Sequence, residues 1–269
     1  MRQLKAEYYK MKYSKASRWI FLFMVLVFFI PFVVGNDTLF MTFGDYRKLN
    51  SIGWICYIDD MAHVKAAEIT RFALSVNFFT WIGFVVYVTT MVAAEFQQGT
   101  IRASVVYGVN RTRLFVCKLF VVNSYFFLLY FIVEAALGLG LAWRYGFHYQ
   151  IHDFAALLAM AALNAVAMLG LEAVAVVITI LLKNTGLVTA IVCVYFFAGA
   201  ITYPMVYENF QNRSLLIRVF CILNPTTYMY NICGYRMTDT LLTGTIFYGI
   251  SACVLGTLVM HAVLKRQEL

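Results

Sequence analysis

The chain has 269 residues, of which 62% are hydrophobic and only 13% are charged, and its mean hydropathy is +0.77. Soluble domains average about 45–50% apolar and about 25% charged residues, so this composition excludes an ordinary soluble domain and indicates an integral membrane protein. The sequence contains no P-loop, no H-E-x-x-H and no G-x-S-x-G motif. We therefore expect a chain that is not itself an enzyme.

Six uncharged or nearly uncharged segments are each close to the roughly 20 residues that a helix needs to cross a bilayer. The first follows a basic segment but is not followed by a signal-peptide cleavage motif, so we expect it to remain attached. The expected fold is all-α, with an interfacial helix at 1–18 and one six-span domain at 19–269. The expected spans are about 19–35, 72–94, 119–142, 154–182, 186–206 and 243–264.

The distribution of Lys and Arg predicts the orientation. With the N-terminus in the cytoplasm, the inner segments carry 13 Lys and Arg and the outer segments carry 8. The positive-inside rule therefore favours cytoplasmic N- and C-termini. Because the excess positive charge lies beside the inner lipid headgroups, the isoelectric point of about 9.2 reflects topology and does not indicate a nucleic-acid partner.

Residues 2–18 place Leu4, Tyr8 and Met11 on one helical face, while lysines occupy the other faces. This pattern predicts a basic helix along the inner membrane interface, before the chain enters the bilayer at Trp19. Simple positive-inside anchoring is the alternative.

The fourth span is rich in alanine, with nine alanines in the 21 residues of 155–175. It contains the small-x-x-x-small pairs Ala155/Ala159 and Ala161/Ala165. Because small residues let helices approach closely in lipid, we expect this span inside the bundle.

The segment between the second and third spans, 95–118, is the most informative part of the sequence. Gly99 can end the second span, Thr100 is a good N-cap, and Gly108 can close a helix, so 101–107 is predicted to form a two-turn helix. Its apolar face suits insertion into a groove of a cytoplasmic partner, although an ordinary connecting loop remains the alternative.

This segment, E-x-x-x-G-T followed by a hydrophobic helix, x-R-x-R and a Lys, resembles the same region of ABC-2 type permeases. The opening L-K-A-E-x-x-K-x-K is also similar to their N-terminus, especially in the Firmicutes group of lantibiotic and bacteriocin immunity transporters and peptide exporters. The resemblance covers the whole chain in length and layout, and its specific motifs lie in residues 4–18 and 95–118.

The resemblance implies a bacterial cell-membrane permease that pairs with a second permease subunit, identical or homologous, and with two ABC ATPase subunits. ATP and Mg would bind to those ATPases and not to this chain. The implied substrate is an amphipathic peptide such as a lantibiotic, or another hydrophobic compound. The implied ATPase-coupling residues are Glu95, Gly99, Thr100, Ile101, Arg102, Tyr107, Gly108, Arg111 and Arg113.

Glu134 and Glu172 fall inside predicted spans, where a charged carboxylate costs at least ~2.5 kcal/mol. Each should therefore face the bundle interior or a partner, either as a functional group or as a structural carboxyl bonded to Asn164, Asn123 or a tyrosine. Two such acids also fit a proton-coupled secondary transporter. A non-transporting membrane scaffold or sensor is a third class.

The outer region 207–242 contains a 17-residue uncharged run that is interrupted by Asn224 and Pro225. Because the residue before a proline is pushed out of helical geometry, we expect a re-entrant helix pair here. In ABC-2 permeases such a hairpin precedes the last span, so the resemblance implies an outer gate at these two residues. A surface loop is the alternative. We expect the first outer loop, 36–71, to be partly ordered.

Six scattered cysteines are expected to be packing residues, although a disulfide among Cys56, Cys221 and Cys233 stays open. The spacing of His148 and His152 could suit a metal, but a solvated loop is the preferred interpretation and no metal site is predicted.

The predicted orientation can be tested with Asn110→Cys or Glu268→Cys in a background without native cysteines. Both positions are expected in the cytoplasm, so a membrane-impermeant thiol reagent should leave them unlabelled in intact cells. Ready labelling of either cysteine would overturn the orientation.

Overall fold

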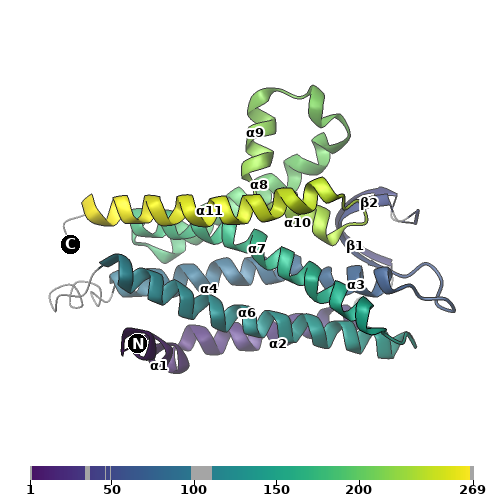
Figure 1. Ribbon diagram of the computed structural model, residues 1–269, viewed down its shortest axis with the longest axis horizontal. Coiled ribbons are helices and arrows are strands. Elements are labelled where there is room, and N and C mark those ends of the chain that lie inside the picture. The colour runs from purple at the N-terminus through teal and green to yellow at the C-terminus, as the bar shows by residue number, and fades with distance from the viewer. Residues whose placement is uncertain (1, 34–36, 46, 49, 98–110, 267–269) are drawn as a thin grey trace.

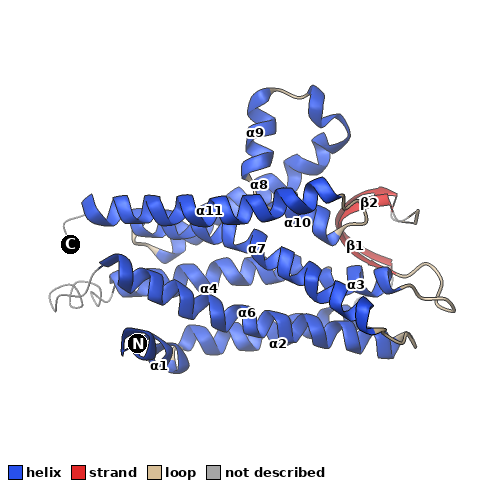
Figure 2. Cartoon of the chain, viewed as in Figure 1, coloured by secondary structure: helices blue, strands red, loops and turns tan. Residues whose placement is uncertain are grey.

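The computed structural model describes residues 2–33, 37–45, 47–48, 50–97 and 111–266. The described chain is mainly long helices, with short helices and one β-hairpin between some of them (Figures 1 and 2). The elements are α1 (Arg2–Tyr13), α2 (Lys15–Val33), β1 (Asp37–Asp45), β2 (Asn50–Tyr57), α3 (Ala66–Leu74), α4 (Asn77–Gln97), α6 (Arg111–Arg144), α7 (Ile151–Leu182), α8 (Thr185–Val206), the 3-10 helix η1 (Tyr207–Asn212), α9 (Leu215–Leu223), α10 (Thr226–Cys233) and α11 (Asp239–Arg266).

Within these ranges, six helical segments are long and apolar enough to cross a membrane, in agreement with the six predicted spans. Their bounds differ from the prediction at several ends. The first begins at Lys15, four residues before the expected start, because α1 ends at Tyr13 and helix resumes almost at once. The second includes α3, and the third extends to Arg144. The predicted spans are shorter because they are defined as uncharged segments, and charged residues lie at these ends.

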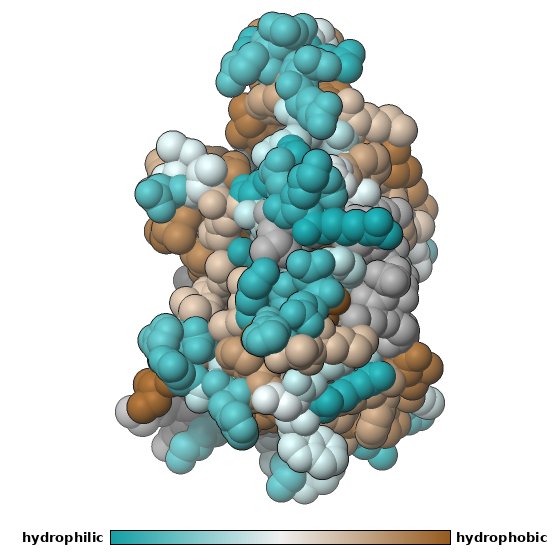
Figure 3. Space-filling model, turned by 90° about the vertical axis from the view of Figure 1, so that its right-hand side faces the viewer, coloured by the Kyte–Doolittle hydropathy of each residue, from teal (hydrophilic) through white to brown (hydrophobic). Residues whose placement is uncertain are grey.

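The long helices lie roughly side by side, and the two ends of the bundle differ (Figure 1). We call the end with α1 and the last turn of α11 the terminal end, and the end with β1 and β2 the hairpin end. Viewed from the hairpin end, hydrophilic residues run down the middle of the surface and hydrophobic residues appear along its margins (Figure 3). A polar end with apolar margins is the distribution expected where a membrane-spanning bundle meets water.

The outer loop at 36–71, which we expected to be partly ordered, contains a β-hairpin, and among the described residues this hairpin is the one departure from an all-α fold. β1 pairs with β2 antiparallel, with Asp37 opposite Tyr57 and Asp45 opposite Asn50, and the register shifts between Phe40 and Phe43. The segment favours strands because it contains many aromatic and β-branched residues and few charged ones.

The hairpin is anchored on the bundle through β2. The buried Trp54 ring lies 5.0 Å from Phe78 of α4 and 4.6 Å from Tyr230 of α10. The backbone N–H of Tyr235 donates to the Ser51 carbonyl over 2.8 Å. The hairpin therefore covers the bundle end instead of forming a loop.

The alanine-rich helix α7 lies inside the bundle, as predicted, and contacts α3, α4, α6, α8, α10 and α11. Its closest partner is α11, where two glycines spaced by seven residues face α7. A Cβ on Gly249 would lie 2.6 Å from the Val166 carbonyl oxygen, and one on Gly256 would lie 2.7 Å from the Ala173 Cβ. Of the two predicted small-residue pairs, Ala161 and Ala165 are buried, whereas Ala155 and Ala159 are exposed.

The region 207–242 forms two short helices on either side of Asn224 and Pro225. Their environments are opposite: all eight residues of α10 are buried in the bundle, whereas α9 stands away from it (Figure 1) and leaves Leu216 82% exposed. Asn224 and Pro225 thus separate α9, which projects from the bundle, from α10, which lies in its core. The depth of these two helices in a membrane stays a prediction.

All six cysteines are free, so no disulfide joins Cys56, Cys221 and Cys233. The Cys56 thiol donates a hydrogen bond to the Ser75 hydroxyl over 2.9 Å. Burial raises the pKa of the Cys56 thiol to about 11. The expected packing role of Cys56 fits this environment.

The contact between α7 and α11 predicts a difference between two glycines of α11. Gly249→Ala should destabilise the fold by about 1–3 kcal/mol, because its methyl group meets the backbone of α7. Gly244→Ala is the matched control, since its methyl group meets only the Tyr228 ring at 3.9 Å, while both variants gain the same helix propensity. Reversible unfolding in detergent measures the two free energies. Equal stability of both variants would contradict the close packing of α7 and α11.

Candidate functional site

Four charged side chains from three helices form one ion cluster at the terminal end. Lys118 Nζ of α6 lies 2.8 Å from Glu95 Oε1 of α4 and 3.8 Å from Glu7 Oε2 of α1. Lys10 Nζ of α1 lies 2.7 Å from Glu7 Oε1 and 3.2 Å from Glu95 Oε1. Each lysine thus contacts both carboxylates, and we call this group the four-residue ion cluster.

The sequence positions each member of the ion cluster by simple helical spacing. Glu7 and Lys10 are three residues apart, so they share one face of α1. Glu95 lies in the last turn of α4, and Lys118 lies two turns into α6. The helices that supply Glu95 and Lys118 are the ones that bracket residues 98–110.

Burial makes the ion cluster a strong constraint. The side chains of Glu7, Glu95 and Lys118 are almost completely buried, whereas Lys10 is 46% exposed. Burial lowers the pKa of Lys10, but the hydrogen bond to Glu7 and the charges of Glu95 and Glu7 outweigh it, so the pKa is raised overall. Removing one of the buried partners leaves another charge uncompensated.

Further contacts hold the helix ends beside the cluster. The Phe96 and Phe115 rings lie 5.5 Å apart, joining the last turn of α4 to the first turns of α6. Lys183 Nζ lies 5.7 Å from the centre of the Phe96 ring. Thr112 Oγ1 and His261 Nδ1 are 2.8 Å apart and join α6 to α11. The adjoining ends of α4 and α6 thus contact each other, the residue that follows α7, and α11.

The predicted coupling residues fall in two groups. Glu95 is a member of the ion cluster, and Arg113 is exposed on the first turn of α6. Arg111 begins α6, and its side chain lies outside the described part. The rest of the predicted segment also lies outside the described residues: Gly99, Thr100, Ile101, Arg102, Tyr107 and Gly108.

Sequence reasoning missed the role of Glu7, Lys10 and Lys118, although all three belong to the motifs quoted above. A signal was present, because Glu7 is the sole acid among residues 1–18 and Lys118 immediately precedes an apolar span. Such a pattern shows that the charges need partners, but it does not show which ones.

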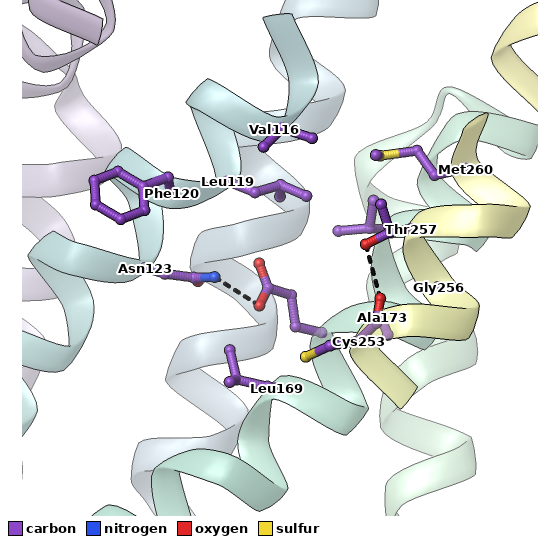
Figure 4. Close-up of a pocket in the computed structure, with 12 residues that line it drawn as sticks. Val116, Leu119, Phe120, Asn123, Leu169, Ala173, Cys253, Gly256, Thr257 and Met260 are labelled. Carbon is purple, nitrogen blue, oxygen red and sulfur yellow. Dashed lines mark hydrogen bonds between the residues drawn. The ribbon is translucent and has the colours of Figure 1, made fainter. Parts of the chain in front are cut away.

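Glu172 lies beside a cavity of about 430 Å³ between α6, α7 and α11. Its Oε2 accepts a hydrogen bond of 2.8 Å from Asn123 Nδ2, which the dashed line from Asn123 marks in Figure 4. Asn123 was one of the partners predicted for the buried acids. The other walls of the cavity are largely apolar, with Leu119 and Met260 among them.

Glu134 is fully buried elsewhere in the bundle and lies close to Tyr130 and Cys233. It is 11 residues from Asn123 on α6, roughly 16 Å along the helix axis. The structure therefore does not bring the two buried acids together. Asn164, the other predicted partner, instead accepts from Trp81 over 3.3 Å and donates to Tyr130 over 3.1 Å.

Asn224 has a clear positioning role at the junction of α9 and α10. Its Nδ2 donates to the Tyr195 carbonyl of α8 over 2.9 Å, and its Oδ1 accepts from the backbone N–H and hydroxyl of Thr226 over 3.0 and 2.6 Å. Pro225 follows at the start of α10. The pair fixes α10 against α8, and its predicted action as an outer gate stays a prediction.

Comparison with known proteins found no protein-family model and no curated protein that this chain matches.

The ion cluster predicts unequal effects of removing its two lysines. Lys118→Met should destabilise the fold by about 3 kcal/mol or more, because Glu95 loses its closest buried partner. Lys10→Met should cost about 1 kcal/mol or less, because Lys10 is half exposed and water can replace it. Unfolding titrations in detergent measure both values. Equal small losses would show that the cluster is an ordinary surface ion pair.

Proposed function

We propose that the chain is the permease subunit of an ATP-driven exporter of the ABC-2 type, working with a second permease and two ATPase subunits. In this proposal the 98–110 segment docks in a groove of an ATPase, and nucleotide-driven closure of the ATPases alters the packing of the two permeases. The lack of a P-loop in the sequence agrees with a subunit that obtains its energy from a partner.

The ion cluster is the observation that carries the proposal. It unites the two motifs that resemble ABC-2 permeases, since Glu7 and Lys10 come from the N-terminal motif and Glu95 and Lys118 from the second. Because the charges are buried and shared, α1 and the helix ends on both sides of the segment should move as one body. A force applied to the segment would then reach α4 and α6 together.

In this proposal the terminal end lies in the cytoplasm and transport is directed out of the membrane. The proposed substrates are amphipathic peptides, such as lantibiotics, or other hydrophobic compounds. The cavity beside Glu172 supports a hydrophobic substrate, because its walls are largely apolar. A proton-coupled carrier built on paired acids is less well supported, since Glu134 and Glu172 lie in separate places.

The proposal is tested by purifying the tagged chain from its own host membranes. We expect a P-loop ATPase in a fixed ratio to the permease, with ATP hydrolysis in the purified complex. Tyr107→Ala removes an aromatic anchor from the docking segment, a type of change that often costs ~2 kcal/mol or more and reduces association roughly 30-fold. Arg111→Glu should have a similar effect through its reversed charge.

Trp143→Ala is the matched control, because Trp143 is an exposed aromatic residue near the far end of α6. It should leave ATPase recovery unchanged. If Tyr107→Ala and Arg111→Glu retain the full amount of ATPase, residues 99–113 are an ordinary loop. If no ATPase copurifies and transport stops when the proton gradient is collapsed while ATP is maintained, the chain is a secondary transporter.

A further inference from the structure

The cavity between α6, α7 and α11 contains two hydrogen-bond acceptors without donors. Glu172 Oε2 accepts from Asn123, but Glu172 Oε1 and Asn123 Oδ1 have no hydrogen-bond partner among the described residues. The nearby hydroxyl of Thr257 donates to the Cys253 carbonyl over 2.7 Å, so its proton is already used. Two residues that line the cavity thus each carry a buried acceptor without a donor.

Glu172 also lacks a cationic partner in this part of the structure. Glu172 is only 6% exposed, and the ion pairs of the described residues do not include it. Lys118 lies on the same helix as Asn123, but it is held by Glu95 and Glu7. A buried carboxylate without a cation is costly unless it takes up a proton, and a ligand that brings a positive charge would stabilise the ionised form of Glu172.

A ligand can reach the acceptors from the flank of the bundle. Val116 and Phe120 line the cavity on α6 and are 46% and 57% exposed, and Cys253 lies on the α11 side (Figure 4). Gly256 keeps the wall of α11 close to Ala173 of α7. The opening therefore faces the apolar flank, which in a membrane is the lipid.

We propose that this cavity binds a hydrophobic primary amine, whose ammonium group donates hydrogen bonds to Glu172 Oε1 and Asn123 Oδ1 while its alkyl chain occupies the apolar part. The volume of about 430 Å³ is near the lower end of the about 300–1,000 Å³ of ordinary ligand pockets. This volume holds one alkyl chain or one side chain of a larger ligand and not a whole peptide. As a substrate site this inference rests on the proposed function, but binding itself can be measured without an ATPase.

The acceptor pair distinguishes this cavity from another groove of similar size. The groove between α2 and α4 has a volume of about 460 Å³ and is lined by Trp19, Phe23 and Val86 among others. Tyr87 in that groove already lies 3.3 Å from the Ser17 hydroxyl. Alkyl chains of any kind should enter such a groove, whereas the Glu172 cavity should select for charge and for N–H donors.

Cys253 provides the reporter, because it lines the cavity. The full chain, with Cys253 retained and the other five cysteines replaced, is reconstituted in lipid nanodiscs and alkylated with N-ethylmaleimide. Decylamine should slow the alkylation of Cys253 by about ten-fold or more. Decanol and decyltrimethylammonium, which lack either the charge or the N–H donors, should slow it much less.

Two variants test whether the protection of Cys253 by decylamine depends on Glu172. Glu172→Gln should reduce protection by decylamine to the level seen with decanol, whereas Glu134→Gln, another buried acid away from the cavity, should retain the protection. Should Glu172→Gln fail to fold, Val116→Trp narrows the opening and should weaken protection by decylamine.

Equal protection by decanol and decylamine, protection that survives in Glu172→Gln, or a Cys253 that never reacts would each overturn the proposal. If amine binding is found and no ATPase copurifies, the binding site stands and its role as a permease substrate site falls. If the ATPase copurifies without amine binding, the proposed function stands and this inference falls.

Discussion

The buried ion cluster of Glu7, Lys10, Glu95 and Lys118 is the constraint on which the terminal end of the structure depends. The three buried members, Glu7, Glu95 and Lys118, share contacts within 4 Å, so removing any one of them leaves a buried partner short of a compensating charge. α1 is therefore part of the bundle and not only a helix that lies on a membrane surface. Its position fixes the ends of α4 and α6, and these ends define where the 98–110 segment leaves and re-enters the fold.

The rest of the bundle is arranged around α7, which α11 approaches closely through its Gly249 and Gly256. That contact brings α11 beside α6 and leaves the Glu172 cavity between the three helices. The cavity and the ion cluster are both near the terminal end, since Asn123 lies little more than one turn after Lys118 on α6. A shift of α6 that follows the ion cluster would thus also change the walls of the cavity.

Hydropathy was sufficient to predict the six spans, because long apolar windows are decided by composition alone. It did not predict the β-hairpin, whose strands are short and whose stability comes from contacts such as Trp54 with Tyr230, far away in the sequence. The same reason hid the ion cluster: Lys10 and Glu95 are 85 residues apart. The sequence showed that Glu172 needs a partner, and only the fold selects Asn123 for that role.

The most direct test of the account is the distance between α1 and α6, measured by pulsed electron spin resonance. Spin labels are placed at the exposed positions Tyr9 and Leu128 in a background without native cysteines. The account predicts one narrow distance distribution, which broadens when Lys118 is replaced by Met because α1 loses its buried anchor. A broad distribution in the unaltered protein, or a narrow one that Lys118→Met leaves unchanged, would contradict the claim that the ion cluster holds α1 to the bundle.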